Sequence, residues 1–207
     1  MKKEILKKRL CEAIENRKDE IISIGRKILE NPELGYREKK TTALIKERFE
    51  NIGLEYVDGV ALTGVKAKIR GKSDNPTIGV FGELDAIVVP DHPFADLETG
   101  AAHACGHNAQ VANLLGVAVG LIDSGVMGNL EGAVAFIGAP AEEFIDIEGR
   151  KKLMDLGEIG FPGGKQELIR MGWLDDVNLA MMIHASPNTP QRRVSVRISM
   201  SCFLAKL

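Results

Sequence analysis

Three short apolar segments constrain the fold of this chain more than any other feature. Residues 77–81, 132–139 and 179–183 contain almost no polar side chains. A segment of this length without polar alternation is typical of a strand that is covered on both faces. Helical patterns separate these segments, and the order strand, loop, helix, strand, loop, helix, strand builds a layered α/β sheet with helices on its faces. The sequence therefore predicts an α/β protein.

The other elements follow from the spacing of apolar residues. Residues 5–29 carry apolar side chains at near-helical spacing, which predicts one long amphipathic helix or two, ended by Asn31-Pro32. A further helix is expected at residues 38–51, and a buried helix at 111–122. Residues 64–69 alternate between apolar and polar, as a half-buried strand does.

Composition excludes several classes of function. The chain has 207 residues, of which 44% are hydrophobic and 27% charged, so it can bury a substantial core. Its 27 basic and 29 acidic residues give no reason to expect a nucleic-acid partner. The charged N-terminus lacks the apolar core of a signal peptide, and no apolar run approaches the roughly 20 residues that span a bilayer. We therefore expect a cytoplasmic protein without a membrane partner.

The segment His103-Ala-Cys-Gly-His-Asn108 places one thiol and two imidazoles within a few residues. Cysteine sulfur and imidazole nitrogen are the ligands that borderline-soft cations such as Zn select. The alternative is a buried thiol beside a histidine that the core satisfies. A disulfide is disfavoured, because the three cysteines are odd in number and widely spaced, which fits a reducing compartment.

Carboxylates and a further histidine follow two of the predicted strands. Glu142 and Glu143 come just after residues 132–139, and His184 directly follows residues 179–183. Strand ends are where α/β enzymes collect their chemistry. An adjacent acid pair can also be an ordinary solvated loop pair. Beside the cysteine and the histidines, the combination favours a metal site over that alternative.

Four motifs together resemble a known family. They are Gly82-Glu-Leu-Asp-Ala86, His103-Ala-Cys-Gly-His-Asn108, Pro140-Ala-Glu-Glu143 and Met182-Ile-His-Ala-Ser-Pro187. In this order they resemble the cocatalytic-metal amidohydrolases and peptidases, which include aminoacylases, glutamate carboxypeptidases and aminobenzoyl-glutamate hydrolases. The segment Asn31-Pro-Glu-Leu-Gly-Tyr-Arg-Glu38 also looks like the first loop of that family. The likeness is strongest to the aminobenzoyl-glutamate hydrolase branch, through Gly-Glu-X-Asp-Ala and Cys-Gly-His-Asn.

The resemblance implies a fold and a set of metal ligands. The expected fold is a three-layer sandwich, with a mostly parallel mixed sheet between helices, as in zinc peptidases. Cys105 becomes the ligand shared by two divalent ions, with His107, Glu143 and His184 as further ligands. Zn fits these ligands, and Mn or Co would be tolerated by the same set.

The resemblance also assigns catalytic residues. Glu142 becomes the catalytic base, and chemistry supports this, because a carboxylate bound to a cation keeps little basicity whereas its free neighbour can accept a proton. Asp85 is placed with it, and is expected to orient a ligand through a hydrogen bond. His103, Asn108 and Glu83 are expected to support the ligands or to face the substrate.

The implied function is metal-dependent hydrolysis of an amide bond. The substrate would be a small molecule: an N-acyl amino acid, an aminobenzoyl-glutamate-like compound or a small peptide. A cysteine hydrolase that uses Cys105 with His107 or His184 is a weaker alternative, because it leaves the paired glutamates unexplained.

The resemblance covers only about the first half of a typical family member. Residues 1–190 are expected to form the N-terminal part of the catalytic domain, and 191–207 the first strand of an incomplete α+β lid domain. Residues 193–200 alternate as such a strand would. A family lid could support a homodimer. The alternative function is a catalytically incomplete fragment, which binds metal or a partner and needs a complementary chain.

Overall fold

The computed structural model describes residues 2–185, and its centre is a five-stranded sheet. The strands lie in the order β1-β2-β6-β3-β7, so that strands far apart in the sequence become neighbours. Their bounds are Tyr56–Val60 for β1, Gly64–Arg70 for β2, Thr77–Glu83 for β3, Ala133–Ala139 for β6 and Leu179–Met182 for β7.

The sheet is mixed and mostly parallel. β3 pairs in parallel with both β6 and β7, whereas β2 is antiparallel to β1 and to β6. β2 is therefore the one strand of this sheet, within the described residues, that runs against the other four. The register sets Glu83 opposite Ala139, so β3 and β6 end at the same level.

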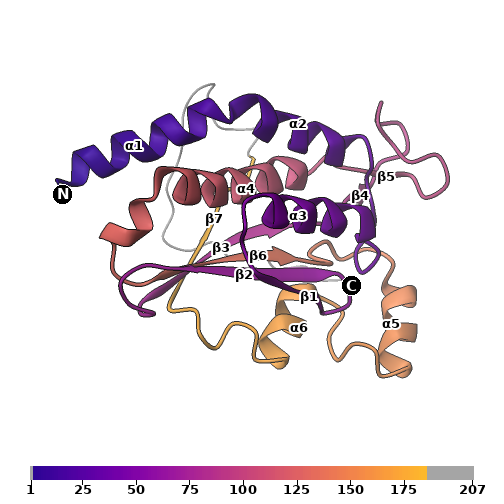
Figure 1. Cartoon of the computed structure of the whole chain (residues 1–207). Helices are drawn as coiled ribbons and strands as arrows, with labels where there is room; N and C mark the ends of the chain where they lie inside the picture. The colour runs from indigo at the N-terminus through magenta and orange to yellow at the C-terminus, as the bar shows by residue number, and fades with distance from the viewer. Residues whose placement is uncertain (1, 186–207) are drawn as a thin grey trace.

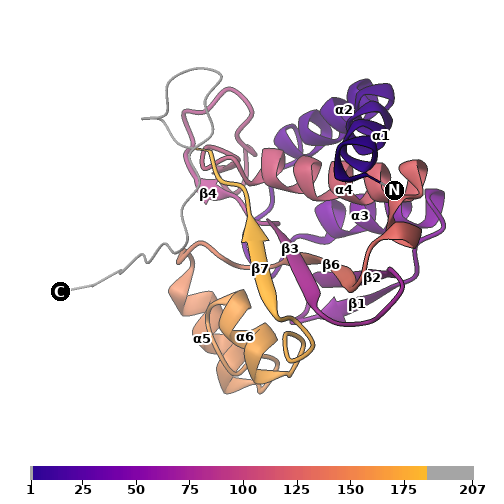
Figure 2. The same ribbon diagram turned by 90° about the vertical axis from the view of Figure 1, so that its left-hand side faces the viewer.

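Helices cover both faces of the sheet and give the three layers that the family resemblance implied (Figures 1 and 2). One face carries α1 (Lys3–Asn16), α2 (Lys18–Leu29), α3 (Lys39–Asn51) and α4 (His107–Ser124). The opposite face carries two shorter helices, α5 (Ile147–Asp155) and α6 (Gly164–Arg170). The remaining elements are the 3-10 turn η1 (Val126–Asn129) and a small hairpin of β4 (Ile87–Val88) and β5 (Ala101–Ala102).

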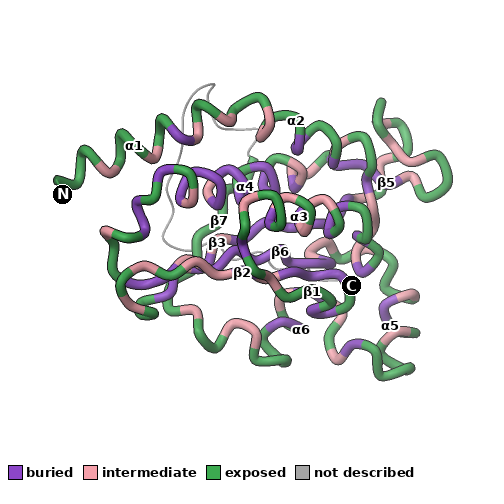
Figure 3. Tube along the Cα trace, viewed as in Figure 1, coloured by how far each residue is buried: buried purple, intermediate pink, exposed green. Residues whose placement is uncertain are grey.

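The core lies on both sides of β6. Phe136 packs with Phe49 of α3 and with α4, while the next residue, Ile137, packs on the opposite face with Leu168 of α6. Successive side chains of a strand point to opposite faces, so an apolar run such as this one must be covered twice. α4 is apolar on almost all sides, and Figure 3 shows it largely buried between the sheet and the outer helices.

The structure confirms the elements predicted from spacing and adds several others. The expectation that residues 179–183 are covered on both faces is wrong, because β7 is an edge strand of the sheet and all four of its residues are exposed. The expected helix at residues 5–29 is two helices, interrupted at Arg17, and the buried helix begins at His107 instead of Val111. Not predicted were β1, the β4–β5 hairpin, α5 and α6. α5 lies within the charged segment 144–162, which has no long apolar run. The expected strand at residues 193–200 and the boundary near 190 lie outside the described residues.

Candidate metal centre

The candidate site lies where three parallel strands end. Residues that follow β3, β6 and β7 supply Asp85, Glu142 and His184 respectively, and α4 begins at the same edge of the sheet. The turn before α4 needs Gly106, whose φ of +94° is in the left-handed region that favours glycine. That turn places Cys105 and His107 on either side of it, both facing the strand ends.

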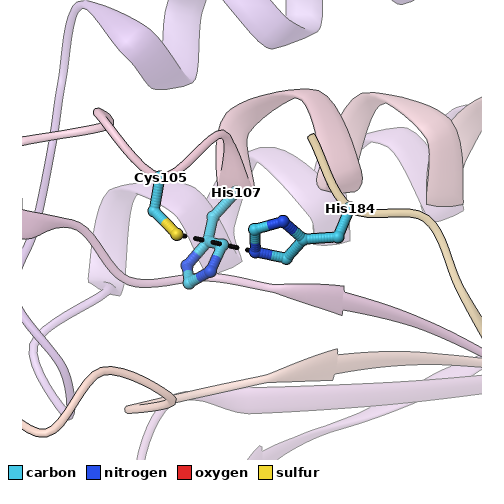
Figure 4. Close-up of side chains that lie close together, drawn as sticks. All are labelled: Cys105, His107 and His184. Atoms are coloured by element: carbon cyan, nitrogen blue, oxygen red, sulfur yellow. Dashed lines mark hydrogen bonds between the residues drawn. The ribbon is translucent and has the colours of Figure 1, made fainter. Parts of the chain in front are cut away.

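Three of the predicted ligands, Cys105, His107 and His184, lie close together (Figure 4). The sulfur of Cys105 is 3.5 Å from Nε2 of His184, and the two imidazole rings meet edge to face with centroids 5.9 Å apart. One ligand atom from each of the three residues lies within 4.8 Å of the others, which is the spacing of atoms that can share one cation. His107 is buried, Cys105 is half-buried and His184 is exposed.

Asp85 holds His107 in a defined orientation. Nδ1 of His107 is 2.8 Å from the backbone carbonyl oxygen of Asp85 and 3.4 Å from its Oδ1. Both neighbouring oxygens are acceptors, so they favour a proton on Nδ1, and Nε2 faces the cluster. The other carboxylate oxygen of Asp85 accepts a hydrogen bond from the backbone N–H of Glu143 at 2.9 Å. Asp85 therefore contacts two of the predicted ligands, and its role in orienting them stays a prediction.

Three glutamates surround Nε2 of His107. This nitrogen is 2.9 Å from Oε2 of Glu83, 3.8 Å from Oε1 of Glu143 and 4.0 Å from Oε2 of Glu142. Glu83, His107 and Glu142 form a second group whose ligand atoms could share a cation. Glu143, the predicted ligand, is at a distance from His107 similar to that of Glu142. Both groups depend on His107, so a single imidazole links them.

The charges in the cluster are poised for a cation. Burial would lower the pKa of His107, but hydrogen bonds with Asp85 and Glu83 outweigh it and raise the pKa to about 10. Burial would likewise raise the pKa of Glu83, whereas His107 and the ammonium group of Lys165 lower it to about 2. The pKa of Glu142 is raised by burial and by the charge of Glu83. The carboxylates of the cluster thus stabilise positive charge beside them, on His107 and Lys165, as they would stabilise a bound cation.

The chemistry of Cys105 also fits a metal ion. Burial, then a hydrogen bond to Glu143, raises the pKa of this thiol to about 12, and the charges of Glu142 and Glu83 act in the same direction. A thiol next to carboxylates is a poor nucleophile, because the thiolate is the reactive form. A divalent cation reverses this by stabilising the thiolate. The donor set of one sulfur, two imidazoles and several carboxylates therefore suits Zn or a similar ion better than it suits cysteine catalysis.

A strained loop carries the two adjacent glutamates. Ala141, just before Glu142, has a φ of +48°, which is unusual for a residue with a side chain. The backbone N–H of Ala141 donates to the carboxylate of Glu38 at 2.7 Å, and the carbonyl oxygen of Ala141 accepts from the N–H of Gly164 at 3.1 Å. Buried Arg150 donates to the carbonyl oxygens of Ala141 and Glu143. The loop is therefore held from three sides.

Two predicted site residues are placed differently from the ligands. His103 is 4% exposed, and neither ring nitrogen has a hydrogen-bond partner among residues 2–185. Burial and the neighbouring His107 lower the pKa of His103 to about 4. Asn108 donates its side-chain N–H to the carbonyl oxygen of Gly25 in α2, at 3.2 Å. The side chain of Asn108 thus ties α4 to α2.

Sequence reasoning did not identify three residues that contact the site. Lys165 forms ion pairs with Glu83 and Glu142, Arg150 holds the loop, and Glu38 binds Ala141. Lys165 follows Gly163 and Gly164, and these two glycines are the only feature of the local sequence that could have indicated a close backbone approach at Lys165. Arg150 lies among charged residues whose pattern resembles a solvated surface.

The chain belongs to peptidase family M20/M25/M40, whose model matches residues 80–199. It is 36% identical over 176 residues to thermostable carboxypeptidase 2 of Saccharolobus solfataricus, covering 83% of this chain and 40% of that protein. It is 30% identical over 181 residues to N-acetylcysteine deacetylase of Bacillus subtilis, covering 86% and 43%. The chain thus spans less than half the length of these relatives.

Solved structures show the same fold. The YxeP protein of Bacillus subtilis, described as a dinuclear metal binding peptidase from the M20 family, matches with a TM-score of 0.67 and 31% identity over 86% of this chain and 45% of that one. The aminobenzoyl-glutamate utilization protein from Klebsiella pneumoniae matches with a TM-score of 0.62 and 18% identity, over 87% and 47%. The predicted family and the three-layer α/β fold are both confirmed.

Among the described residues, no helix has the length and apolar character needed to cross a membrane.

Proposed function

We propose that this chain supplies the N-terminal catalytic half of a metal-dependent hydrolase that cleaves an amide bond in an N-acyl amino acid, an aminobenzoyl-glutamate-like compound or a small peptide. The names of the relatives support this class, since a carboxypeptidase and an N-acetylcysteine deacetylase both break an amide bond next to an amino acid. The observation that carries the proposal is the meeting of Cys105, His107 and His184 with two adjacent glutamates at one sheet edge.

The residues of the site divide into metal ligands and one catalytic base. Cys105, His107, Glu143 and His184 would hold divalent cations, and the family resemblance makes Cys105 the ligand shared between two. When bound, such a cation polarises a carbonyl group and makes a nearby water more acidic. Zn suits the sulfur and imidazole donors best, and Mn or Co fits the same set.

Glu142 is the group that moves a proton. Burial and the charge of Glu83 raise its pKa, which suits a base that must accept a proton near neutral pH. The attacking water would give its proton to a carboxylate oxygen of Glu142, which would then pass it to the departing amine. Asp85 keeps Nδ1 of His107 occupied and fixes the backbone of Glu143, so it orients two of the metal ligands.

A second candidate is a half that binds metal but requires a complementary segment or chain for turnover. It is favoured by the exposure of His184 and of every residue of β7. A site open on that side neither excludes water nor positions the carboxylate of a substrate. A lid domain such as the family resemblance implies would close it and could also form a homodimer.

The test joins metal content with turnover. We expect the 207-residue chain to bind about one equivalent of Zn²⁺ or more, measured by elemental analysis, and Glu143→Gln to lose most of it. Glu142→Gln should keep its metal. Release of free amine from N-acetyl amino acids is measured for the chain and for a chimaera that joins residues 1–185 to the C-terminal part of the Bacillus subtilis deacetylase. Glu142→Gln should lower that turnover about a hundredfold or more.

The outcomes separate the proposals. Turnover only in the chimaera supports the need for a complementary segment, and turnover in both supports a self-sufficient chain. Bound metal without chelator-sensitive hydrolysis in either protein contradicts amide hydrolysis. Unchanged metal content in Cys105→Ser with His107→Ala contradicts the assignment of the metal ligands.

A further inference from the structure

Lys165 brings a positive charge into the cluster from the opposite face of the sheet. It lies in α6, and its Nζ contacts Oε1 of Glu83 and is 3.5 Å from Oε1 of Glu142. Its side chain is 34% exposed, whereas that of Glu83 is 1% exposed. The ammonium group therefore bridges a fully buried carboxylate and a half-buried one.

The backbone fixes where this ammonium group can lie. A Cβ on Gly164 would fall 1.7 Å from the carbonyl oxygen of Pro140, so only glycine lets α6 come this close to the glutamate loop. The N–H of Gly164 also donates to the carbonyl oxygen of Ala141 at 3.1 Å. Gly164 directly precedes Lys165, and Ala141 directly precedes Glu142. The hydrogen bond between Gly164 and Ala141 therefore holds the segments of Lys165 and Glu142 together.

Glu83 anchors the lysine on its other side. Its Oε2 accepts a hydrogen bond from Nε2 of Gln110 at 2.7 Å and faces Nε2 of His107 at 2.9 Å. The Glu83 side chain is therefore held by α4 and cannot follow Lys165 if it moves. Glu142 has no comparable anchor, since Lys165 is the one side chain in the described part of the chain that donates a hydrogen bond to its carboxylate.

From this position the carboxylate of Glu142 can either stay paired with Lys165 or bind a cation held by His107. Its Oε1 points to Lys165, and its Oε2 is 4.0 Å from Nε2 of His107, about the same distance as the neighbouring Glu143. Carboxylates are good ligands for divalent cations, so both glutamates could bind an ion that His107 holds. Something must keep one of the two free if it is to act as a base.

We propose that Lys165 is the positioning residue that keeps Glu142 out of the coordination shell, by binding its carboxylate and linking it to the anchored Glu83. This inference rests on the proposed function, because it explains how two adjacent glutamates take different roles. Without the ammonium group, Glu142 gains by binding the cation and ceases to be an available base.

Cobalt alone is the probe, because its visible d–d bands report coordination number and geometry without any turnover. Co²⁺ is titrated into the 207-residue chain, Lys165→Met, Glu142→Gln and the double variant Lys165→Met/Glu142→Gln. Lys165→Met should bind Co²⁺ about fivefold tighter or more, with weaker d–d bands as a further oxygen ligand joins. Glu142→Gln should resemble the unsubstituted chain, and the double variant should lose both the gain in affinity and the spectral change.

Controls separate positioning from charge and from folding. Lys151→Met removes an exposed lysine from α5 and should change neither property. Lys165→Arg should keep the original spectrum. If Lys165→Met fails to fold because Glu83 is left buried and unpaired, Glu83→Gln/Lys165→Met, which removes the pair together, is compared with Glu83→Gln and should show the same gain.

Each outcome decides the proposal. A gain in affinity that persists without the Glu142 carboxylate would show that Lys165 acts only through its charge, and would overturn the positioning role while leaving the metal site intact. Identical spectra for Lys165→Met and the unsubstituted chain would do the same. If the unsubstituted chain bound no Co²⁺, the metal centre and this inference would fall together.

Discussion

At the scale of single residues, Glu38 shows how a buried carboxyl group supports the site through the backbone of the glutamate loop. It is fully buried, accepts hydrogen bonds from the hydroxyl of Thr63 and the N–H of Ala141, and so connects the start of α3 to the glutamate loop. Burial, and then the negative charge of Asp85, raises the pKa of Glu38 to about 7. The folded chain therefore binds this proton more tightly than the unfolded chain does.

This pKa predicts a pH dependence of stability. An exposed glutamate in the unfolded chain has a pKa of about 4.3, so between that pH and about 7 the folded state holds one more proton at Glu38. The contribution is complete below the lower pKa and is lost as the pH rises toward the upper one. We expect on the order of 3 kcal/mol of unfolding free energy to disappear across this window.

Urea unfolding of the metal-free chain at several pH values measures this effect. Glu38→Gln keeps the shape of the side chain without the proton, so it should remove this part of the pH dependence. The same slope in the variant and in the unsubstituted chain would show that other groups are responsible.

At the scale of elements, α5 acts as a brace for the glutamate loop. Arg150 is 3% exposed, and it donates to the carbonyl oxygen of Pro162 at 2.8 Å as well as to those of Ala141 and Glu143. Its guanidinium group also lies over the ring of Tyr36, 5.6 Å from the centroid. The charged segment after β6 therefore reaches the site through one buried arginine.

Arg150→Met should destabilise the chain by about 2–4 kcal/mol, because it removes three hydrogen bonds of a buried guanidinium group and takes from the carbonyl oxygen of Pro162 its donor. It should also weaken metal binding, since Glu143 loses one of the hydrogen bonds that fix its backbone. Urea unfolding and a Zn²⁺ titration measure the two effects. Lys151→Met, at the exposed neighbour on the same helix, should stay within about 0.5 kcal/mol of the unsubstituted chain. Equal effects of the two substitutions would contradict the brace.

At the scale of the whole molecule, the two edges of the sheet differ. β1 carries Asp58, which is paired with Lys46 of α3, whereas β7 has an apolar sequence, and all four of its residues are exposed. Leu179 is 59% exposed and Met181 63%. An apolar edge strand offers unpaired backbone groups to another chain. We therefore expect the chain to self-associate through β7.

Met181→Lys should raise the protein concentration at which association begins severalfold, as measured by light scattering and analytical ultracentrifugation. Charge on an edge strand opposes strand pairing between molecules. Ile22→Lys is the matched control, because Ile22 on α2 is 55% exposed but lies on a helix. Equal improvement from both substitutions would show that general surface polarity, and not the β7 edge, governs association.

The sequence by itself determined the class of fold and most elements. Apolar segments such as residues 132–139 can be satisfied only when both faces are covered, so local pattern already requires helices on two sides. The motif around Cys105 and the strand-end position of His184 likewise predicted which side chains converge, because parallel strands end at one edge. These inferences depend on local periodicity, which the chain carries in each segment.

Only the tertiary structure decided the strand order and the contacts that distinguish the glutamates. β2 lies between β1 and β6, a choice made by pairings across more than 60 positions that no local pattern encodes. Lys165 meets Glu83 across 82 positions, and Arg150 reaches the loop from a segment that resembles solvated surface. Ion pairs and side-chain hydrogen bonds depend on distances of a few ångströms, and these are set only when helices and sheet pack together.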